Sequence, residues 1–484
     1  MTKQDLQPAG IFKYFGDICL VPRASKHEEK IIAFLKSFAA AQGLAIKCDA
    51  AGNILISKPA SKGMENRPVV ILQSHLDMVC EKNSSSTHNF DTDPIDWYID
   101  NGWIKAKGTT LGADCGIGIA AQLALLTDKN LVHGPIECLF TVDEETGLTG
   151  ANALEPGFMT GNILLNLDSE DEGELFIGCA GGMDIVGTFD YTTYPLPSGY
   201  ALFQYTVGGL IGGHSGDDIN RGRGNAVKIA TRFLWQAQQE CDICISRFTG
   251  GNLRNAIARE ASALIAVERS QIPALKQLFE KHAAEVQYEL SFTDAGIQQT
   301  LNETQASGEV FLIDLVTQAQ LLYCLQACPH GVIGMSPTMP GLVETSTNLA
   351  SVKFADNNQI LVGTSQRSSV ESAKYNIAHT VDAVFCLAGA KIEYGDGYPG
   401  WAPNIHSPIL ALTKNVYQQL FNTEPEVKAI HAGLECGLFL EKYPQLDMIS
   451  FGPTIKNAHS PDEKLDIQSV EKFWCLLLEV LRRV

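Results

Sequence analysis

The chain has 484 residues, of which 45% are hydrophobic, and its 36 basic and 55 acidic side chains give a formal net charge of −19. This length and apolar content argue against disorder and indicate two domains, or one large domain carrying an insertion. The acidic balance and the scattered basic residues argue against a nucleic-acid partner. Because no apolar run is long enough to cross a bilayer and the N-terminus lacks a signal-peptide pattern, we expect a cytoplasmic protein without membrane contact.

The first third of the chain alternates strands with helices. Helical spacing covers residues 30–42 and 116–127. Strands are predicted at 45–48, 53–58, 69–72, 136–142 and 163–167. The continuous apolar run at 69–72 is typical of a buried parallel strand. This alternation predicts an α/β fold, with a doubly wound, largely parallel sheet and helices on both faces.

The character of the sequence changes near Gly181 and Gly182. From Tyr200 the order is strand, helix, strand, strand, helix, strand, which resembles an extended ferredoxin-like unit. The predicted strands are 201–209, 241–248, 255–267, 287–292, 347–354, 360–366 and 391–394, and the predicted helices are 225–240, 273–285, 310–327 and 370–386. An α+β domain is therefore expected at this point of the chain.

The last part of the chain returns to the α/β pattern. A Gly- and Pro-rich stretch, 395–404, is typical of a linker. It precedes predicted helices at 408–421 and 467–481 and predicted strands at 427–430 and 447–451. We therefore expect one discontinuous catalytic domain, residues 1–185 and 396–484, interrupted by an inserted α+β domain, residues 186–395.

Histidine and carboxylate side chains follow four of the predicted strands of the α/β part. They are His75 and Asp77, then Asp143, Glu144 and Glu145, then Asp168, and finally His459 after a short loop. Ligands gather at the carboxyl ends of strands in open α/β sheets, so these side chains can converge on one site. Imidazole and carboxylate ligands suit zinc better than calcium, which prefers oxygen alone. Asp77, two residues after His75, can accept a hydrogen bond from the ring N–H group of a metal-bound imidazole.

Two other motifs leave alternatives open. Gly116-x-Gly118-x-x-Ala121 mimics a dinucleotide-binding fingerprint, although no buried strand precedes it. Cys241 and Cys244 form a single C-x-x-C without a second pair nearby, so a zinc or redox role competes with a pair of buried thiols. The acidic stretches are also compatible with solvated loops.

The ordered motifs resemble the co-catalytic zinc peptidases of the M20 clan, and within it the dipeptidases that cleave aminoacyl-histidine. The similarity spans nearly the whole chain and rests on SHLDMVCEKN, TLGADCGIG, LFTVDEETGLTGA, LLNLDSED, GGHSGDDI and NAHSPDEKL. It implies two Zn²⁺ ions per subunit, for which Co²⁺ or Mn²⁺ can substitute. The implied metal ligands are His75 and Asp168 on one ion, Glu145 and His459 on the other, and Asp114 between both.

The same resemblance implies a mechanism. Glu144 acts as the general base for a bridging hydroxide activated by the two zinc ions, and Asp77 holds His75. His214, supplied by the neighbouring subunit of a homodimer, stabilises the oxyanion, so the inserted domain serves as lid and dimerisation domain. The family also commonly has a cis peptide bond after the bridging aspartate, here between Asp114 and Cys115.

Three further residues are candidates for substrate binding. Arg367 and Asn348 could hold the C-terminal carboxylate of a peptide and nearby polar atoms, and Glu435 could bind the free α-amino group. The implied activity is metal-dependent hydrolysis of Xaa-His and other small dipeptides, with carnosine-like substrates included. The alternative is an aminoacylase or amidohydrolase of the same clan that acts on N-acyl amino acids. A metal-binding protein without catalysis and a purely structural acidic protein are more distant alternatives.

Overall fold

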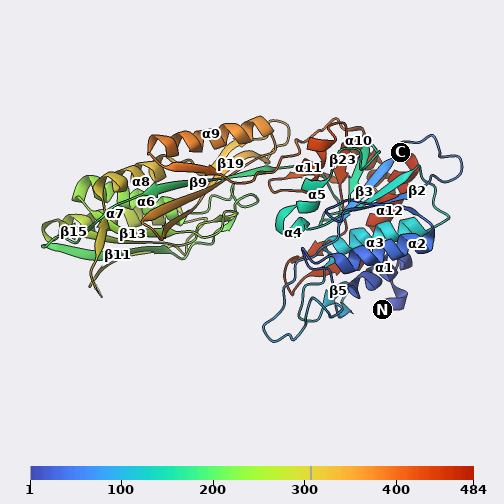
Figure 1. Ribbon diagram of the computed structural model, residues 1–484, viewed down its shortest axis with the longest axis horizontal. Helices are drawn as coiled ribbons and strands as arrows, with labels where there is room; N and C mark the ends of the chain where they lie inside the picture. Colours follow the sequence, from blue (N-terminus) through green and yellow to red (C-terminus); the bar gives the residue numbers. More distant parts are fainter. Residues whose placement is uncertain (1, 306–307) are drawn as a thin grey trace. The chain divides into compact units, whose positions relative to one another are not determined.

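The computed structural model describes residues 2–305 and 308–484, and the chain forms two compact units (Figure 1). The first unit consists of Met1–Cys179, Trp401–Ala429 and Leu434–Val484. The second consists of Ala180–Gly400 and Ile430–Gly433. The chain therefore leaves the first unit after Cys179, returns to it at Trp401, and leaves it a second time for the four residues Ile430–Gly433.

The first unit contains both helices and short strands. Its helices are α1 (Ala9–Cys19), α2 (Glu29–Gln42), α3 (Ala113–Thr127), α4 (Glu144–Gly147), α5 (Thr149–Ala153), α10 (Pro408–Phe421), α11 (Glu435–Lys442) and α12 (Ile467–Arg483). Its strands are β1 (Ala45–Cys48), β2 (Ile54–Lys58), β3 (Val70–His75), β4 (Trp97–Asp100), β5 (Trp103–Ala106), β6 (Ile136–Thr141), β7 (Ile163–Asn166), β8 (Glu174–Cys179), β22 (Glu426–Ile430), β23 (Asp447–Ser450), β24 (Ile455–Lys456) and β25 (Lys464–Asp466).

An eight-stranded sheet in the order β1-β2-β6-β3-β7-β23-β8-β22 forms the centre of the first unit. The pairs β6–β3, β3–β7 and β7–β23 are parallel, whereas β1–β2, β2–β6 and β23–β8 are antiparallel. Every residue of β3 and β6 is buried, so both faces of these strands are covered. The predicted α/β class with a largely parallel sheet is confirmed, and the antiparallel strands lie toward its edges.

The second unit is built on longer strands. Its strands are β9 (Gly181–Asp190), β10 (Thr193–Pro195), β11 (Tyr200–Gly208), β12 (Gly213–His214), β13 (Cys244–Gly250), β14 (Ala256–Ile257), β15 (Ala261–Glu268), β16 (Gln298–Thr304), β17 (Phe311–Ile313), β18 (Gly331–Met335), β19 (Val343–Ala355), β20 (Gln359–Ser368) and β21 (Lys391–Tyr394). Its α-helices are α6 (Ala226–Cys241), α7 (Ile272–Glu289), α8 (Leu315–Ala327) and α9 (Glu371–Leu387).

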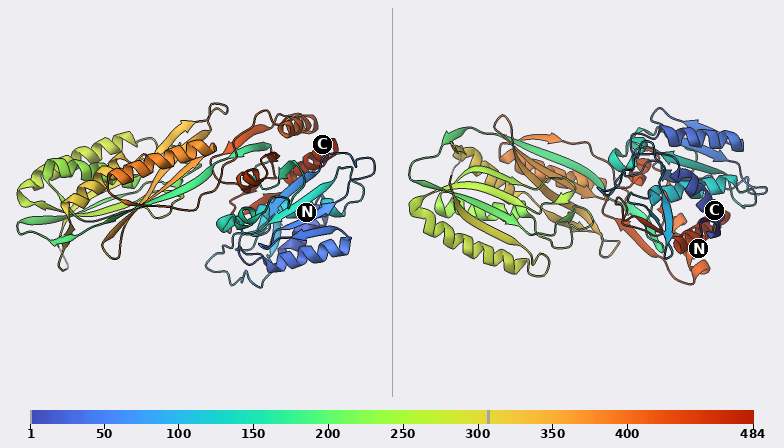
Figure 2. Two further views of the ribbon diagram at one scale, coloured as in Figure 1. Left: turned by 45° about the horizontal axis from the view of Figure 1, so that its top comes forward. Right: turned by 90° about the horizontal axis from the view of Figure 1, so that it is seen from below.

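A nine-stranded antiparallel sheet, in the order β16-β11-β15-β13-β19-β20-β9-β21 with β18 beside β19, carries the core of the second unit. Alternate residues of β11, such as Phe203 and Tyr205, belong to the same buried cluster as Phe233 of α6, Leu321 of α8 and Phe385 of α9. The helices therefore cover one face of the sheet (Figure 2, left). The predicted inserted α+β architecture is confirmed.

Some predicted elements differ from the structure. Residues 287–289 belong to helix α7 and not to a strand, because Val286 is buried on the face that this helix turns to the core. The expected strand at 255–267 is divided into β14 and β15. The polar strand β16 escaped prediction because it lies at an edge of the sheet and contains few apolar residues.

A buried histidine makes the second unit sensitive to acid. His282 of α7 is 1% exposed, and its ring centroid lies 5.6 Å from that of Phe233. Burial lowers the pKa of His282 to about 4, from 6.5. Between these two values the unfolded chain binds a proton that the folded chain does not, so the free energy of unfolding falls as the pH drops from 6.5 to 4, by roughly 3 kcal/mol for this group.

We expect His282→Leu to remove that part of the acid sensitivity. The check is urea unfolding of wild type and variant at several pH values between 4 and 7. As the pH falls, the free energy of unfolding of the variant should decrease less than that of the wild type. His379→Leu, which makes the same substitution at an exposed position of α9, is the control. An unchanged pH dependence in His282→Leu would contradict the expectation.

No helix in the two described stretches of the chain combines the length and the apolar composition that crossing a bilayer requires.

Candidate metal centre

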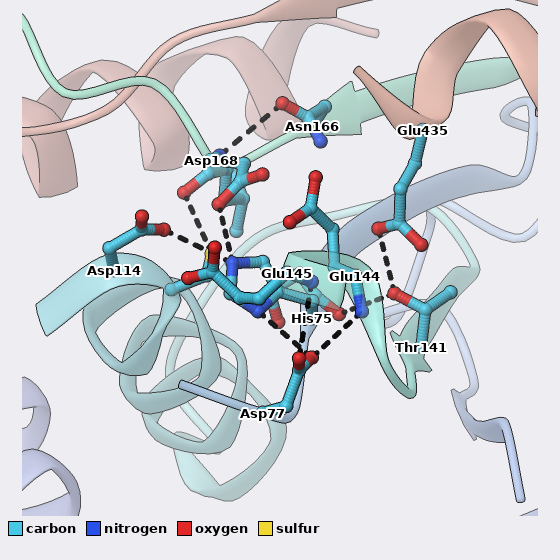
Figure 3. Close-up of polar contacts among 12 residues, drawn as sticks. His75, Asp77, Asp114, Thr141, Glu144, Glu145, Asn166, Asp168 and Glu435 are labelled. Atoms are coloured by element: carbon cyan, nitrogen blue, oxygen red, sulfur yellow. Dashed lines mark hydrogen bonds and ion pairs between the residues drawn. The ribbon is translucent and has the colours of Figure 1, made fainter. Parts of the chain in front are cut away.

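The end of strand β3 places a histidine in the interior of the first unit. His75 is its last residue and is 1% exposed. Its Nε2 atom lies 3.1 Å from Oδ1 of Asp114 and 3.2 Å from Oδ1 of Asp168, and its Nδ1 atom lies 3.3 Å from Oδ1 of Asp77 (Figure 3). One imidazole therefore faces three carboxylates.

Asp114 lies between two histidines. Its Oδ1 atom faces His75, and its Oδ2 atom lies 3.2 Å from Nε2 of His459. The same Nε2 atom is 3.0 Å from Oε2 of Glu145. The peptide bond between Asp114 and Cys115 is cis, as the resemblance implied. The two oxygens of one carboxylate thus face two imidazoles, that of His75, which also contacts Asp168, and that of His459, which also contacts Glu145.

Asp77 connects the end of β3 with the start of α4. Its Oδ1 atom accepts a hydrogen bond from the backbone N–H of Glu144 at 3.0 Å, and its Oδ2 atom accepts one from the N–H of Glu145 at 3.2 Å and one from the hydroxyl of Ser25 at 2.8 Å. Burial raises the pKa of Asp77, but the contact with His75 and these donors outweigh it and lower the pKa to about 2. Asp77 is therefore an anion that orients both His75 and the two glutamates.

The cluster has the chemistry of a divalent metal site. Ligand atoms of His75, Asp114 and Glu145 lie within 4.8 Å of one another, as do those of His75, Cys115 and Asp168. Burial raises the pKa of Asp168 to about 6, and the charge of Asp114 adds to this effect. Oε1 of Glu145 is buried and has no hydrogen-bond partner in the described chain. A cation would satisfy this oxygen and offset the repulsion among the carboxylates, so the residues fit a metal.

Glu435 starts helix α11 next to this cluster. Its Oε2 atom accepts hydrogen bonds from Nε2 of Gln73 at 2.6 Å and from the hydroxyl of Thr141 at 2.8 Å (Figure 3). Its Oε1 atom is buried without a hydrogen-bond partner among the described residues. Burial raises the pKa of Glu435 to about 8. Glu144 lies beside it in Figure 3, and burial also raises the pKa of Glu144 well above the usual value.

Two further buried residues form hydrogen bonds with the backbone next to the site. Neither residue was predicted from the sequence. The carboxylate of Glu463 accepts hydrogen bonds from the backbone around Gly112, and the guanidinium of Arg23 donates to the carbonyl oxygens of Leu76 and Asp77. Glu463 lies in the motif that contains His459, but an acid in a loop sequence rich in Asp and Lys carries no separate signal. Arg23 lies in the N-terminal region, far from every motif in sequence.

His214, in the short strand β12, belongs to the second unit. Its Nδ1 atom lies 3.4 Å from Oδ2 of Asp217 and accepts from the backbone N–H groups of Gly216 and Asp217, each at 3.3 Å. Because two N–H groups point at Nδ1, a neutral ring carries its proton on Nε2. The ring is 32% exposed, so that N–H is available as a donor.

Arg367 and Asn348 lie on neighbouring strands of the second unit, β20 and β19. Arg367 is 7% exposed and donates to the hydroxyls of Tyr398 at 2.9 Å and Ser215 at 3.4 Å, and among the described residues no carboxylate forms an ion pair with it. Asn348 uses its Nδ2 atom for the carbonyl oxygens of Arg254 and Ala256. The other polar atom of this side chain, Oδ1, is buried and has no hydrogen-bond partner within the described part of the chain.

Comparisons with known proteins identify the family of the chain. Residues 71–483 match Peptidase family M20/M25/M40. The chain is 44% identical over 479 residues to the cytosol non-specific dipeptidase of Escherichia coli (strain K12), covering 99% of this chain and 98% of the relative. The crystal structure of aminoacylhistidine dipeptidase from Vibrio alginolyticus superposes with a TM-score of 0.93 at 44% identity, covering 100% of this chain and 98% of that one.

A more distant structure shares the fold alone. Aminopeptidase PepT from Bacillus cereus ATCC 10987 has a TM-score of 0.59 at 16% identity, covering 99% of this chain and 98% of that one. The family match covers most of the chain, and the E. coli relative is matched over nearly its whole length. The protein therefore belongs to Peptidase family M20/M25/M40.

Proposed function

We propose that the protein is a metal-dependent dipeptidase that hydrolyses Xaa-His and other dipeptides. The observation that carries this proposal is the position of Asp114, whose two carboxylate oxygens face the Nε2 atoms of His75 and His459 at 3.1 and 3.2 Å. A carboxylate between two imidazoles is suited to bridge two divalent ions. The names of the two relatives at 44% identity support the assignment to dipeptides.

The metal centre would hold two ions, with Zn²⁺ as the proposed metal and Co²⁺ or Mn²⁺ as substitutes. His75 and Asp168 would bind one ion, His459 and Glu145 the other, and Asp114 both. When bound, two such ions would polarise the scissile carbonyl and lower the pKa of a water molecule. Asp77 would accept a hydrogen bond from the protonated Nδ1 of His75, which leaves Nε2 of that ring unprotonated and free to bind the metal.

Glu144 is the proposed general base. It starts α4 next to the proposed ligand Glu145, and it belongs to neither group of clustered ligand atoms. Its carboxylate would take a proton from the attacking water as the new C–O bond forms. It would return that proton to the leaving amine as the C–N bond breaks. A side chain that shuttles a proton in this way cannot also be occupied as a metal ligand.

Two buried ionisable side chains would recognise the two ends of the substrate. Arg367 is a buried cation without an ion-pair partner in the described chain, and it is suited to the substrate's C-terminal carboxylate. Glu435 has one buried oxygen without a hydrogen-bond partner there, and it is suited to the free α-amino group. Asn348 would accept from a substrate N–H through Oδ1.

His214 would donate its Nε2–H to the oxyanion, and we infer that it acts from the second subunit of a homodimer. Strand β18 supports such an assembly, since three of its apolar side chains are 37%, 49% and 48% exposed; these are Val332, Ile333 and Met335. The inserted unit would then serve as lid and dimerisation domain, and the first unit as the catalytic domain. The name of the E. coli relative supports a cytoplasmic location.

A substrate panel tests the dipeptidase assignment. We expect hydrolysis of free dipeptides and little activity on tripeptides. The matching dipeptide amides should lose about 10- to 100-fold in kcat/KM, and N-acetylated amino acids should also be poor substrates, because each of these two classes lacks one charged end and loses a charge-assisted contact. Chelation should abolish the activity, and Zn²⁺, Co²⁺ or Mn²⁺ should restore it. Activity after complete metal removal would refute the proposal, and a preference for N-acetylated amino acids would indicate an aminoacylase.

A further inference from the structure

The backbone that carries Asp114 is bound by a carboxylate from a distant part of the chain. Glu463 accepts hydrogen bonds from four consecutive backbone N–H groups. Its Oε2 atom accepts from Leu111 at 2.7 Å and Gly112 at 2.9 Å, and its Oε1 atom accepts from Ala113 at 2.7 Å and Asp114 at 3.4 Å. Glu463 is 2% exposed, so water does not compete for these donors.

The same backbone segment is held from its other side by Arg23. The guanidinium, which is 3% exposed, donates to the carbonyl oxygen of Gly112, and its Nη1 atom donates to those of Leu76 at 2.9 Å and Asp77 at 2.6 Å. Arg23 thereby ties the segment before Asp114 to the segment after His75.

The segment has no room for a side chain at position 112. Gly112 has φ +69°, and a Cβ atom there would lie 2.6 Å from Nη2 of Arg23 and 2.7 Å from Sδ of Met78. The backbone can approach the guanidinium this closely only because position 112 has no side chain. The close packing against Arg23 and Met78 fixes Gly112, and the hydrogen bonds to Glu463 fix the N–H groups of Ala113 and Asp114 that follow it.

Glu463 is also linked to the second proposed metal cluster. It follows His459 by four residues, and its backbone N–H donates to the carbonyl oxygen of Ser460 at 3.0 Å. One side chain therefore connects the turn that carries His459 with the segment that carries Asp114. The two oxygens of Asp114 face His75 and His459 only while both segments keep this register.

We propose that Glu463 is a positioning residue of the metal centre, which sets the backbone of Asp114 so that its carboxylate bridges the two ions. This inference rests on the proposed function, because it assumes that Asp114 binds both metals. Partners that orient metal ligands typically change metal affinity by about 10- to 100-fold when they are removed. Glu463 acts on the backbone of the ligand and touches no reacting atom.

The chain offers a matched control. Glu137 of β6 is likewise buried, and its carboxylate accepts from the backbone N–H groups of Thr160 at 2.8 Å and Gly161 at 3.3 Å. It lies near the start of β6, whereas the proposed ligand Glu145 follows the end of that strand. Glu137→Gln therefore removes another buried carboxylate that accepts from backbone N–H groups, in a strand of the eight-stranded sheet, without touching the segment of Asp114.

The experiment compares wild type, Glu463→Gln, Glu463→Asp and Glu137→Gln as full-length proteins. Zn²⁺ affinity is measured by competition with a chromophoric chelator, and the visible spectrum is recorded after loading with Co²⁺. We expect Glu463→Gln to bind the ions about 10- to 100-fold more weakly, to change the Co²⁺ spectrum, and to lower kcat more than it raises KM. Glu463→Asp, which keeps the charge, should fall between it and wild type.

Glu137→Gln should lose stability but keep the wild-type affinity and Co²⁺ spectrum. Wild-type Zn²⁺ affinity and spectrum in folded Glu463→Gln would overturn the inference. If that variant does not fold, wild-type values in Glu463→Asp would overturn it instead. Failure of the proposed function is distinguishable, because wild type itself would then bind fewer than two ions or cleave no dipeptide, and the inference would fall with it.

Discussion

We expect Glu144→Gln to lower kcat for dipeptide hydrolysis by about 1,000-fold while the metal content stays at the wild-type value. The amide has nearly the shape of the carboxylate but cannot take a proton from water. The backbone N–H of Glu144, which donates to Asp77, is kept in the variant, so the start of α4 should keep its position. Steady-state kinetics and elemental analysis of the purified variant check both parts of the expectation.

The neighbouring glutamate provides the contrast. Oε2 of Glu145 lies 3.0 Å from Nε2 of His459, so Glu145→Gln should weaken metal binding and lose activity for that reason. Added metal should then restore part of the activity of Glu145→Gln and none of that of Glu144→Gln. The opposite pattern, with metal lost in Glu144→Gln and kept in Glu145→Gln, would mean that the roles of the two adjacent residues are exchanged.

The convergence of the site could be predicted because it follows from local patterns. The apolar runs before His75, Glu144 and Asp168 indicate buried parallel strands, and the carboxyl ends of such strands lie at one edge of a sheet. The structure places β6, β3 and β7 side by side, which brings these ends together. The α/β class was predictable for the same reason.

The support around the site could not be predicted from such patterns. Glu463 binds backbone N–H groups about 350 residues away in sequence, and Arg23 binds carbonyl oxygens, so neither contact requires a particular side chain in its partner. The orientation of the Asn348 side chain could not be predicted from the sequence either. Its Nδ2 atom is used by two backbone carbonyls, which leaves Oδ1 as the only atom for a substrate.

We expect His214→Ala to lower kcat by about 100- to 1,000-fold, since removal of one oxyanion donor typically has this effect. The backbone N–H groups of Gly216 and Asp217 point at Nδ1 of the ring, which leaves Nε2 to donate. Because His214 lies in the second unit and none of the proposed metal ligands does, the metal content should stay at the wild-type value. Steady-state kinetics on a free dipeptide and elemental analysis provide the measurements.

Mixing two inactive variants tests whether His214 acts on the neighbouring subunit. In a mixed dimer of His214→Ala and Glu144→Gln, the His214→Ala subunit keeps its general base and receives an intact histidine from its partner. Random exchange of subunits should therefore restore about a quarter of the wild-type activity, since half of the dimers are mixed and each has one complete site. A histidine that acts within its own subunit would restore none, because each subunit then lacks one required group. The outcome thus separates a shared active site from two independent ones.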